Sequence, residues 1–117
     1  MGLLDLFGTV PSVDAARARE LVSDGAVLLD VRESSEWNAG HAPQAEHLPL
    51  GRIREASKKV RGGKQVVVVC RSGNRSRHAT KSLIAMGYDA VNLSGGMHAW
   101  KRAGGQVVDR AGRVGSV

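Results

Sequence analysis

The stretch QVVVVCRSGNRS, residues 65–76, is the part of the sequence that decides the fold. Its first five residues, Gln65 to Val69, form a short apolar run rich in β-branched side chains, which is typical of a parallel strand buried on both faces. A polar loop from Cys70 to Ser76 follows at once. Because Gly73 and Asn74 tolerate positive φ, we expect this loop to turn sharply into a helix.

Further strands and helices are expected on both sides of this stretch. Apolar runs predict strands at Ala26 to Val31 and Ala90 to Leu93, and a weaker one at Ala45 to Leu48. Apolar residues at helical spacing predict a helix with Pro11-Ser12 as its N-cap and Gly25 at its end, and three others: around Ile53, Ala56 and Val60; around Ala79, Leu83 and Met86 with Gly87 as the cap; and from Met97 to Ala103. This alternation predicts an α/β three-layer domain with a mainly parallel central sheet flanked by helices.

The chain of 117 residues is long enough for one domain. We divide it into an N-terminal extension (residues 1–10), the α/β domain (residues 11–104) and a C-terminal tail (residues 105–117). Residues 1–9 and the segment from Gly104 onward are rich in glycine and have little periodicity, so we expect both ends to pack loosely.

Composition argues against several classes of function. The net charge of +6 invites comparison with nucleic-acid-binding proteins, but the basic residues come in short pairs without interleaved aromatic residues, so we expect no nucleic-acid partner. A basic surface still attracts small anionic substrates. A single cysteine excludes an internal disulfide and a multi-cysteine zinc site, and we expect no metal and no cofactor. Without a membrane-length apolar run or a signal peptide, no membrane association is expected and the cytoplasm is the expected compartment.

Cys70 stands where an α/β sheet binds its ligands, at the carboxyl end of a strand. The loop after it combines successive N–H groups, a helix N-terminus and nearby arginines, which together make a cradle for an anion. Such surroundings lower the pKa of a thiol and populate the nucleophilic thiolate. A purely structural cysteine does not require a basic, glycine-containing loop of this kind, so we interpret Cys70 as a nucleophile.

The loop length distinguishes two reactions of a thiolate in an anion cradle. Tyrosine-phosphatase chemistry uses a cysteine and an arginine with five residues between them, so that the loop wraps a phosphate. Here four residues separate Cys70 from Arg75, and Ser76 occupies the position that would satisfy the longer spacing. A loop one residue shorter makes a smaller bowl, which favours a single persulfide sulfur over a tetrahedral oxyanion.

In these features the sequence resembles the rhodanese family over roughly residues 11 to 104. Four motifs occur in the order found in that family: LDVRE at Leu29 to Glu33, followed by Glu36-Trp37 and Gly40-His41; AEHLPL at Ala45 to Leu50; CRSGNRS at Cys70 to Ser76; and LSGG at Leu93 to Gly96, leading to Trp100. Each motif alone is weak, whereas four in order at normal spacing are specific.

The resemblance implies a sulfurtransferase in which Cys70 alternates between thiolate and persulfide. Thiosulfate or a related small anionic donor supplies the sulfur, and cyanide, a thiol or a protein removes it. The active-site loop is then Arg71, Ser72, Gly73, Asn74, Arg75 and Ser76, whose N–H groups stabilise the persulfide anion. Two alternatives stay open: a persulfide carrier that serves a protein partner, and a rhodanese-like binding module without catalysis.

Several residues around the loop have two interpretations. Arg71 and Arg75 are candidates for holding the anionic donor, but Arg75 is also able to pair with a carboxylate that stiffens the loop, for which Asp30 is the first candidate. We assign loop-bracing roles to Asp30 and Arg32. Arg77 and His78 are either solvated residues of the first helical turn or substrate contacts. Packing or structural roles are expected for the remaining motif residues Glu36, Trp37, His41 and Trp100.

Overall fold

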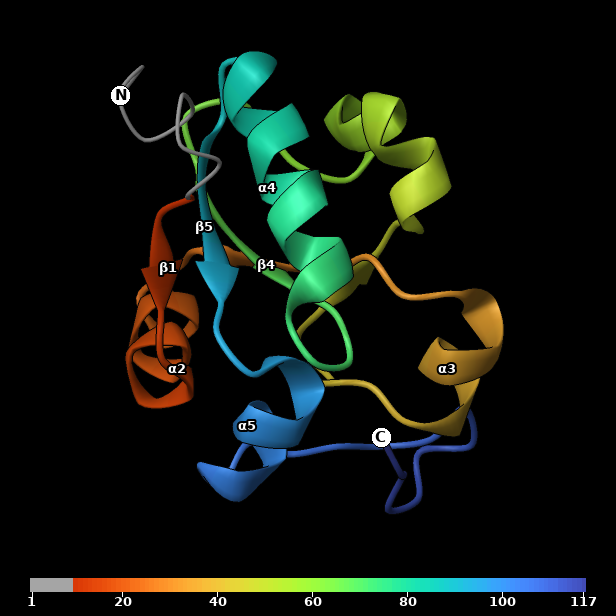
Figure 1. The fold of residues 1–117 in the computed structure, drawn as a ribbon. Helices are drawn as coiled ribbons and strands as arrows, with labels where there is room; N and C mark the ends of the chain where they lie inside the picture. Colours follow the sequence, from red (N-terminus) through yellow and green to blue (C-terminus); the bar gives the residue numbers. More distant parts are fainter. Residues whose placement is uncertain (1–9) are drawn as a thin grey trace.

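A five-stranded parallel sheet forms the centre of the computed structural model, which describes residues 10–117. The strands are β1 (Ser12–Val13), β2 (Val27–Asp30), β3 (Glu46–His47), β4 (Gln65–Val69) and β5 (Asp89–Leu93). They lie in the order β1-β5-β4-β2-β3 and every neighbouring pair is parallel, so β4 is the central strand (Figure 1). The predicted α/β class with a mainly parallel sheet is confirmed.

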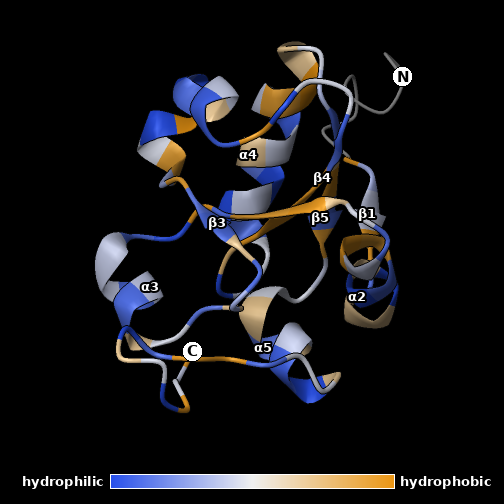
Figure 2. Cartoon of the chain, turned by 180° about the vertical axis from the view of Figure 1, so that it is seen from behind, coloured by the Kyte–Doolittle hydropathy of each residue, from blue (hydrophilic) through white to orange (hydrophobic). Residues whose placement is uncertain are grey.

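Helices cover both faces of this sheet and complete three layers. One face packs against α4 (Asn74–Ala85) and the 3₁₀ helix η1 (Leu50–Lys58), and the other against α2 (Ala15–Ser23) and α5 (Gly96–Arg102). The four valines of β4 alternate between these faces: Val66 and Val68 join the first layer, Val67 and Val69 the second. All four are fully buried, and Figure 2 shows β4 as a hydrophobic strand enclosed between helices. The apolar run is continuous because both faces are covered.

The structure corrects the expected helices and strands in four places. The segment around Ile53 and Ala56 is a kinked 3₁₀ helix, consistent with buried residues three apart rather than at α-helical spacing. Helix α2 is capped by Asp14, whose carboxylate accepts a 2.8 Å hydrogen bond from the Arg17 N–H, because Ser12 belongs to β1. Helix α3 (Ser34–Ala39) and strand β1 were not predicted; both are short and have weak apolar periodicity.

The C-terminal tail packs against the domain, so the expectation of loose packing is wrong for this end. The Trp100 indole N–H donates to the Gln106 carbonyl at 3.0 Å, Val107 is 7% exposed, and Val108 pairs with His41 in an isolated antiparallel bridge. Further along, the Ser116 N–H donates to the Ala39 carbonyl. Backbone pairing therefore secures a segment that lacks helical or strand periodicity. The predicted N-terminal extension lies, except for its last residue, outside the described residues.

Helices long and apolar enough to cross a membrane are absent from residues 10–117.

Candidate active site

The loop from β4 to α4 places Cys70 at the carboxyl end of the central strand. Gly73 is the N-cap of α4 and has a φ of 115°, a conformation that side chains with a Cβ rarely adopt. The first turn of α5 braces the loop from the other side, since the Met97 N–H donates to the Cys70 carbonyl at 2.8 Å. A Cβ on Gly96 would overlap the carbonyl oxygens of Cys70 and Arg71. Two glycines thus allow the loop to be this tight.

The Cys70 thiol is buried, 1% of the residue being exposed, and lies inside a set of hydrogen-bond donors. The Gly73 N–H donates to Sγ at 3.1 Å and the Ser76 hydroxyl at 3.3 Å. Burial raises the pKa of Cys70, but hydrogen bonds from the Ser76 hydroxyl and from the N–H groups of Ser76, Gly73 and Ser72 outweigh it and hold the pKa below its ordinary value. The site therefore favours a thiolate.

Ser76 connects the thiol to strand β5. Its hydroxyl lies 2.5 Å from the Asn92 amide oxygen and 3.1 Å from the Gly73 carbonyl, in addition to the contact with Sγ. Asn92 in turn reaches Ser12 on β1, with 3.4 Å between Nδ2 and Oγ. Ser76 and Asn92 are both buried, so this is an internal polar network.

Arg75 is paired with Glu36 of α3, which corrects the expectation that Asp30 would be its partner. Its guanidinium donates two hydrogen bonds to the Glu36 carboxylate, at 2.5 and 2.8 Å. The pairing lowers the pKa of Glu36 to about 2, against burial that raises it, and raises the pKa of Arg75. Arg75 thus links α4 to α3 next to the loop, and Glu36 occupies the bracing position that its motif suggested.

Asp30 is instead the partner of Arg32, and this ion pair is fully buried. The Arg32 guanidinium donates to both Asp30 oxygens at 2.7 to 3.1 Å and to the Gly40 carbonyl at 2.6 Å. The pair fixes the segment between β2 and the end of α3, the helix that carries Glu36. The contacts that connect the Asp30–Arg32 pair to the Cys70 loop therefore pass through α3, whose Glu36 binds Arg75.

Arg71, Ser72 and Asn74 are the exposed members of the loop. Arg71 lines a small cavity of about 160 Å³. The other residues that line it are Arg32, Glu36, Ala39, Ser116 and Val117. Two arginines from different segments meet there, and the tail supplies one wall. The sequence offered no indication that Ser116 and Val117 would reach this place.

The aromatic and histidine side chains of the motifs have structural contacts. Trp100 is buried, whereas Trp37 stacks on His41 with ring centroids 3.8 Å apart and on His47 at 4.8 Å. His41 Nδ1 lies 2.8 Å from the Trp37 carbonyl, which confirms its expected structural hydrogen bond. Within residues 10–117 no group of three or more His, Cys, Asp or Glu side chains gathers as a metal site.

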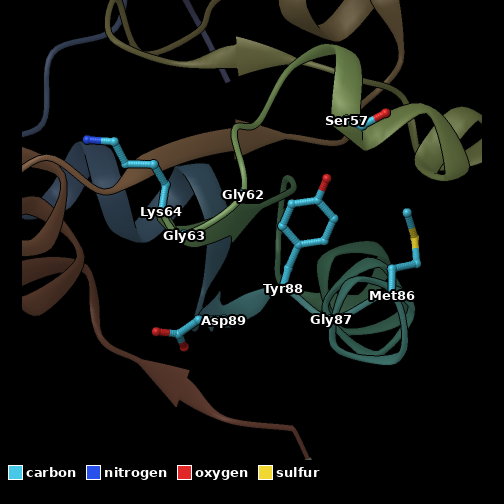
Figure 3. A pocket seen from close by; sticks show the side chains of 8 residues that line it. All are labelled: Ser57, Gly62, Gly63, Lys64, Met86, Gly87, Tyr88 and Asp89. Atoms are coloured by element: carbon cyan, nitrogen blue, oxygen red, sulfur yellow. The ribbon is translucent and has the colours of Figure 1, made fainter.

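A larger cavity of about 480 Å³ lies at the opposite end of β4 (Figure 3). Met86 and Tyr88 point into the space below Ser57, beside the Gly62-Gly63 turn. Lys64 directly precedes β4, and Asp89 is the first residue of β5. The cavity is therefore separated from Cys70 by the length of a strand. The cavity therefore belongs to a different part of the molecule from the Cys70 loop.

Asn92, which links Ser76 to Ser12, is a member of the thiol network that sequence reasoning missed. It reads as an ordinary strand residue in the run AVNL, residues 90–93. A polar side chain near the carboxyl end of an otherwise apolar strand was the available signal, because buried polar groups require partners.

Comparisons with known proteins agree with this geometry. The family model described as Rhodanese-like domain matches residues 14–103. The chain is 43% identical over 74 residues to the Bacillus subtilis protein named "Putative sulfurtransferase YtwF", which covers 63% of this chain and 72% of that protein. A rhodanese-related protein from Thermoplasma volcanium has a similar structure, with a TM-score of 0.76 and 33% identity over 84% of this chain and 97% of that one.

A thiosulfate sulfurtransferase from Pseudomonas aeruginosa has the same fold at a TM-score of 0.79 and 26% identity. The likeness covers 98% of this chain but 23% of that one. The chain likewise covers 46% of a second curated relative, from Synechocystis. Several relatives are thus much longer than the region they share with this chain.

Proposed function

This chain belongs to the rhodanese-like domain family, and from that premise we propose that it is a sulfurtransferase in which Cys70 carries sulfur as a persulfide. The observation that carries the proposal is the Cys70 thiol at the end of β4, hydrogen-bonded by the Gly73 N–H and the Ser76 hydroxyl. These donors favour the thiolate, which is the attacking species in thiol exchange. The relatives named as sulfurtransferases support the same reaction class.

In the first half of the proposed reaction, the Cys70 thiolate attacks the outer sulfur of thiosulfate. A bond forms between Sγ and that sulfur, the sulfur–sulfur bond of thiosulfate breaks, and sulfite leaves with its electron pair. Because Cys70 is only 1% exposed, side chains at the loop surface must shift as the donor enters. Arg71 is exposed at the loop and offers the guanidinium for the anionic donor.

In the second half, cyanide or a thiolate attacks the outer sulfur of the persulfide and Cys70 leaves as the thiolate. The N–H groups that face Sγ stabilise both the persulfide anion and the departing thiolate. The chain has no second cysteine to resolve the persulfide as an internal disulfide. The sulfur therefore leaves to an external acceptor.

The proposal is tested by loading the protein with thiosulfate and measuring its mass. We expect a gain of one sulfur atom that cyanide removes, and no gain in Cys70→Ser. Since Cys70 is the only cysteine, any labile sulfur is assigned to it without mapping. A wild-type protein that takes no sulfur from thiosulfate or from a panel of persulfide donors would contradict sulfur transfer.

One observation favours a second role, persulfide delivery to an acidic protein. We define the basic rim by six side chains of three neighbouring segments: Arg71 of the Cys70 loop, Arg77, His78 and Lys81 of α4, and Lys101 and Arg102 of α5. None of the six forms an ion pair within residues 10–117. Four residues of α4, two of them cationic, also line a shallow hollow. Unpaired positive charge around a nucleophile attracts an acidic partner.

This role is tested with two cysteine-containing peptides as sulfur acceptors. One peptide has glutamates around its cysteine, and the other has serines at the same positions. For Arg77→Glu/Lys81→Glu we expect sulfur transfer to the acidic peptide to fall several-fold while transfer to the serine peptide is retained. The matched control is Lys59→Glu/Arg61→Glu, which makes the same charge change near the other end of β4. Equal rates for the two peptides in the wild type would argue against an acidic acceptor.

A further inference from the structure

We propose that Asn92 is a positioning residue for the Cys70 thiolate, acting through Ser76. Its amide nitrogen donates to the Ser76 hydroxyl oxygen, so that the hydroxyl proton is directed at Sγ. This role serves the sulfur transfer proposed above and rests on it only for its use in catalysis. The orientation itself concerns the thiolate and is measured without a sulfur donor.

The Ser76 hydroxyl has fewer protons than the acceptors that surround it. The hydroxyl has one proton, yet three acceptors lie within reach: the Asn92 oxygen at 2.5 Å, the Gly73 carbonyl at 3.1 Å and Sγ at 3.3 Å. With the amide oxygen facing Ser76, the shortest contact takes that proton and Sγ loses its hydroxyl donor. The two amide protons of Asn92 then have one partner between them, Ser12 Oγ at 3.4 Å. The side of Asn92 that faces Ser76 thus has more acceptors than protons, and the side that faces Ser12 has more protons than acceptors.

Rotating the Asn92 amide by half a turn removes this mismatch. The oxygen and nitrogen of an asparagine amide are nearly equal in shape, so the hydrogen-bond network decides which of them faces Ser76. In the rotated form, Nδ2 donates to Ser76 Oγ and the hydroxyl proton is free for Sγ. At the other end, the Ser12 hydroxyl donates to the Val10 carbonyl at 3.3 Å while it accepts from Nδ2, and in the rotated form its proton turns from that carbonyl to Oδ1. Ser12 therefore tolerates both orientations, and the charge on Cys70 selects between them.

Burial makes the choice of orientation matter. Ser76 is fully buried and Asn92 is 3% exposed, so water does not replace a misdirected hydrogen bond. The charged side chain facing the thiol is Arg75, whose pKa is raised first by its hydrogen bond to Glu36 and in part by Cys70. Arg75 and Glu36 stay unchanged in every variant proposed below. A change in the thiol pKa then reports the Ser12–Asn92–Ser76 chain.

The test measures the pKa of Cys70 from the pH dependence of its alkylation rate, which has a single source because the chain has one cysteine. Asn92→Leu keeps the approximate size but donates nothing. We expect it to raise the thiol pKa by about one unit, a tenfold loss of thiolate at a pH below the pKa. In the Ser76→Ala background the same replacement should change the pKa little. If the amide oxygen faces Ser76 in the thiolate state instead, Asn92→Leu frees the hydroxyl proton and lowers the pKa, which would overturn the proposal.

Asn92→Asp is the second variant, for the case in which leucine disturbs folding. Aspartate keeps the shape of asparagine but only accepts, so it holds the Ser76 proton away from Sγ. Its charge raises the thiol pKa by itself, and that part persists in Ser76→Ala. The excess measured with Ser76 present is the positioning effect; an excess of zero contradicts it. Ser12→Ala, at the outer end of the chain, should shift the pKa less than either replacement.

The results separate this inference from sulfur transfer. A protein that loads sulfur on Cys70 but shows no pKa response to Asn92 replacement keeps the proposed function and loses the positioning role. A protein with the expected pKa response that accepts no sulfur loses the proposed function and keeps the positioning role.

Discussion

Arg75 shows how one side chain's neighbours change its interpretation. From the sequence it stands five positions after the nucleophile and reads equally well as a donor-binding group or as a brace. In the structure two hydrogen bonds to Glu36 engage its guanidinium, and the donor-binding role passes to the exposed Arg71. An arginine that is already paired with a carboxylate offers less to an anionic substrate than a free one, because the pair must first separate.

Replacing Glu36 with Gln tests the brace. The carboxyl pKa of about 2 in the folded protein lies below the ordinary value of 4.5, so the pair stabilises the fold fully above about pH 4.5 and loses this contribution as the pH falls toward 2. Because the pair is partly exposed, we expect Glu36→Gln to lower the free energy of unfolding by about 1 kcal/mol near neutral pH. Urea titrations of the wild type and of Glu36→Gln, near neutral pH and at a pH close to 2, measure this difference in the free energy of unfolding.

The matched control for the brace is Glu46→Gln, an exposed carboxylate on β3 without an ion pair among the described residues. Its effect on the free energy of unfolding should stay within about 0.5 kcal/mol at either pH. A Glu36→Gln effect of the same size at both pH values would show that the ion pair contributes nothing.

Arg71 is the residue whose replacement should affect donor binding without affecting folding. A guanidinium hydrogen-bonded to an anion contributes enough for Arg71→Ala to weaken the apparent affinity for thiosulfate by about tenfold. Arg71→Lys should retain part of it, since it keeps the charge but not the fork of donors. Steady-state kinetics with thiosulfate as the varied substrate measure the change, and the melting temperature controls for folding. An unchanged KM in Arg71→Ala removes Arg71 from the donor site.

At the scale of the elements, the sequence predicted what depends on apolar periodicity. The strands at Gln65–Val69 and Asp89–Leu93 and the helices α2, α4 and α5 were expected within a few residues. Strand β1 and helix α3 were not, because pairing with β5 and the capping box of Glu33 and Glu36 stabilise them rather than a buried apolar face. Within the site, local sequence predicted the loop around Cys70. The partners Glu36 and Asn92 come from distant segments and required the fold.

The junction between the Cys70 loop and α5 predicts a difference between two glycines. Gly96 has a φ of 61° and Gly112 a φ of 84°, so alanine at either position costs about 1 kcal/mol in backbone strain. Only at Gly96 would the new Cβ overlap the carbonyls of Cys70 and Arg71, whereas nothing lies within 4 Å at Gly112. We expect Gly96→Ala to displace the loop and remove most sulfur loading, and Gly112→Ala to retain it.

Both variants are compared by mass after thiosulfate loading and by their urea midpoints. The two alanines share the left-handed backbone strain, so the difference between them isolates the overlap with the loop. Equal loading by Gly96→Ala and Gly112→Ala would mean that α5 does not set the position of Cys70.

Across the whole molecule, the site joins parts that are far apart in the chain. β4 and α4 hold the nucleophile, β5 supplies Asn92, α3 supplies Glu36, and the tail lines the cavity at Arg71. The elements meet at the carboxyl edge of the parallel sheet, where the strand ends and helix N-termini converge (Figure 1). The net charge of +6 adds a long-range attraction for anions to this short-range geometry.

The C-terminal tail packs against the domain, and replacing two of its valines tests how much this packing contributes to the free energy of unfolding. Val107 is 7% exposed and packs with Trp100 and Met97, whereas Val114 is 89% exposed. Val107→Ala removes two buried methyl groups and leaves a small void, so we expect the free energy of unfolding to fall by about 2 kcal/mol. Val114→Ala makes the same chemical change in solvent and should stay within about 0.5 kcal/mol. Urea unfolding of both variants decides between a packed tail and a dispensable one. A packed tail requires the large effect at Val107 alone, and equal small effects at both positions would mean that the domain is stable without it.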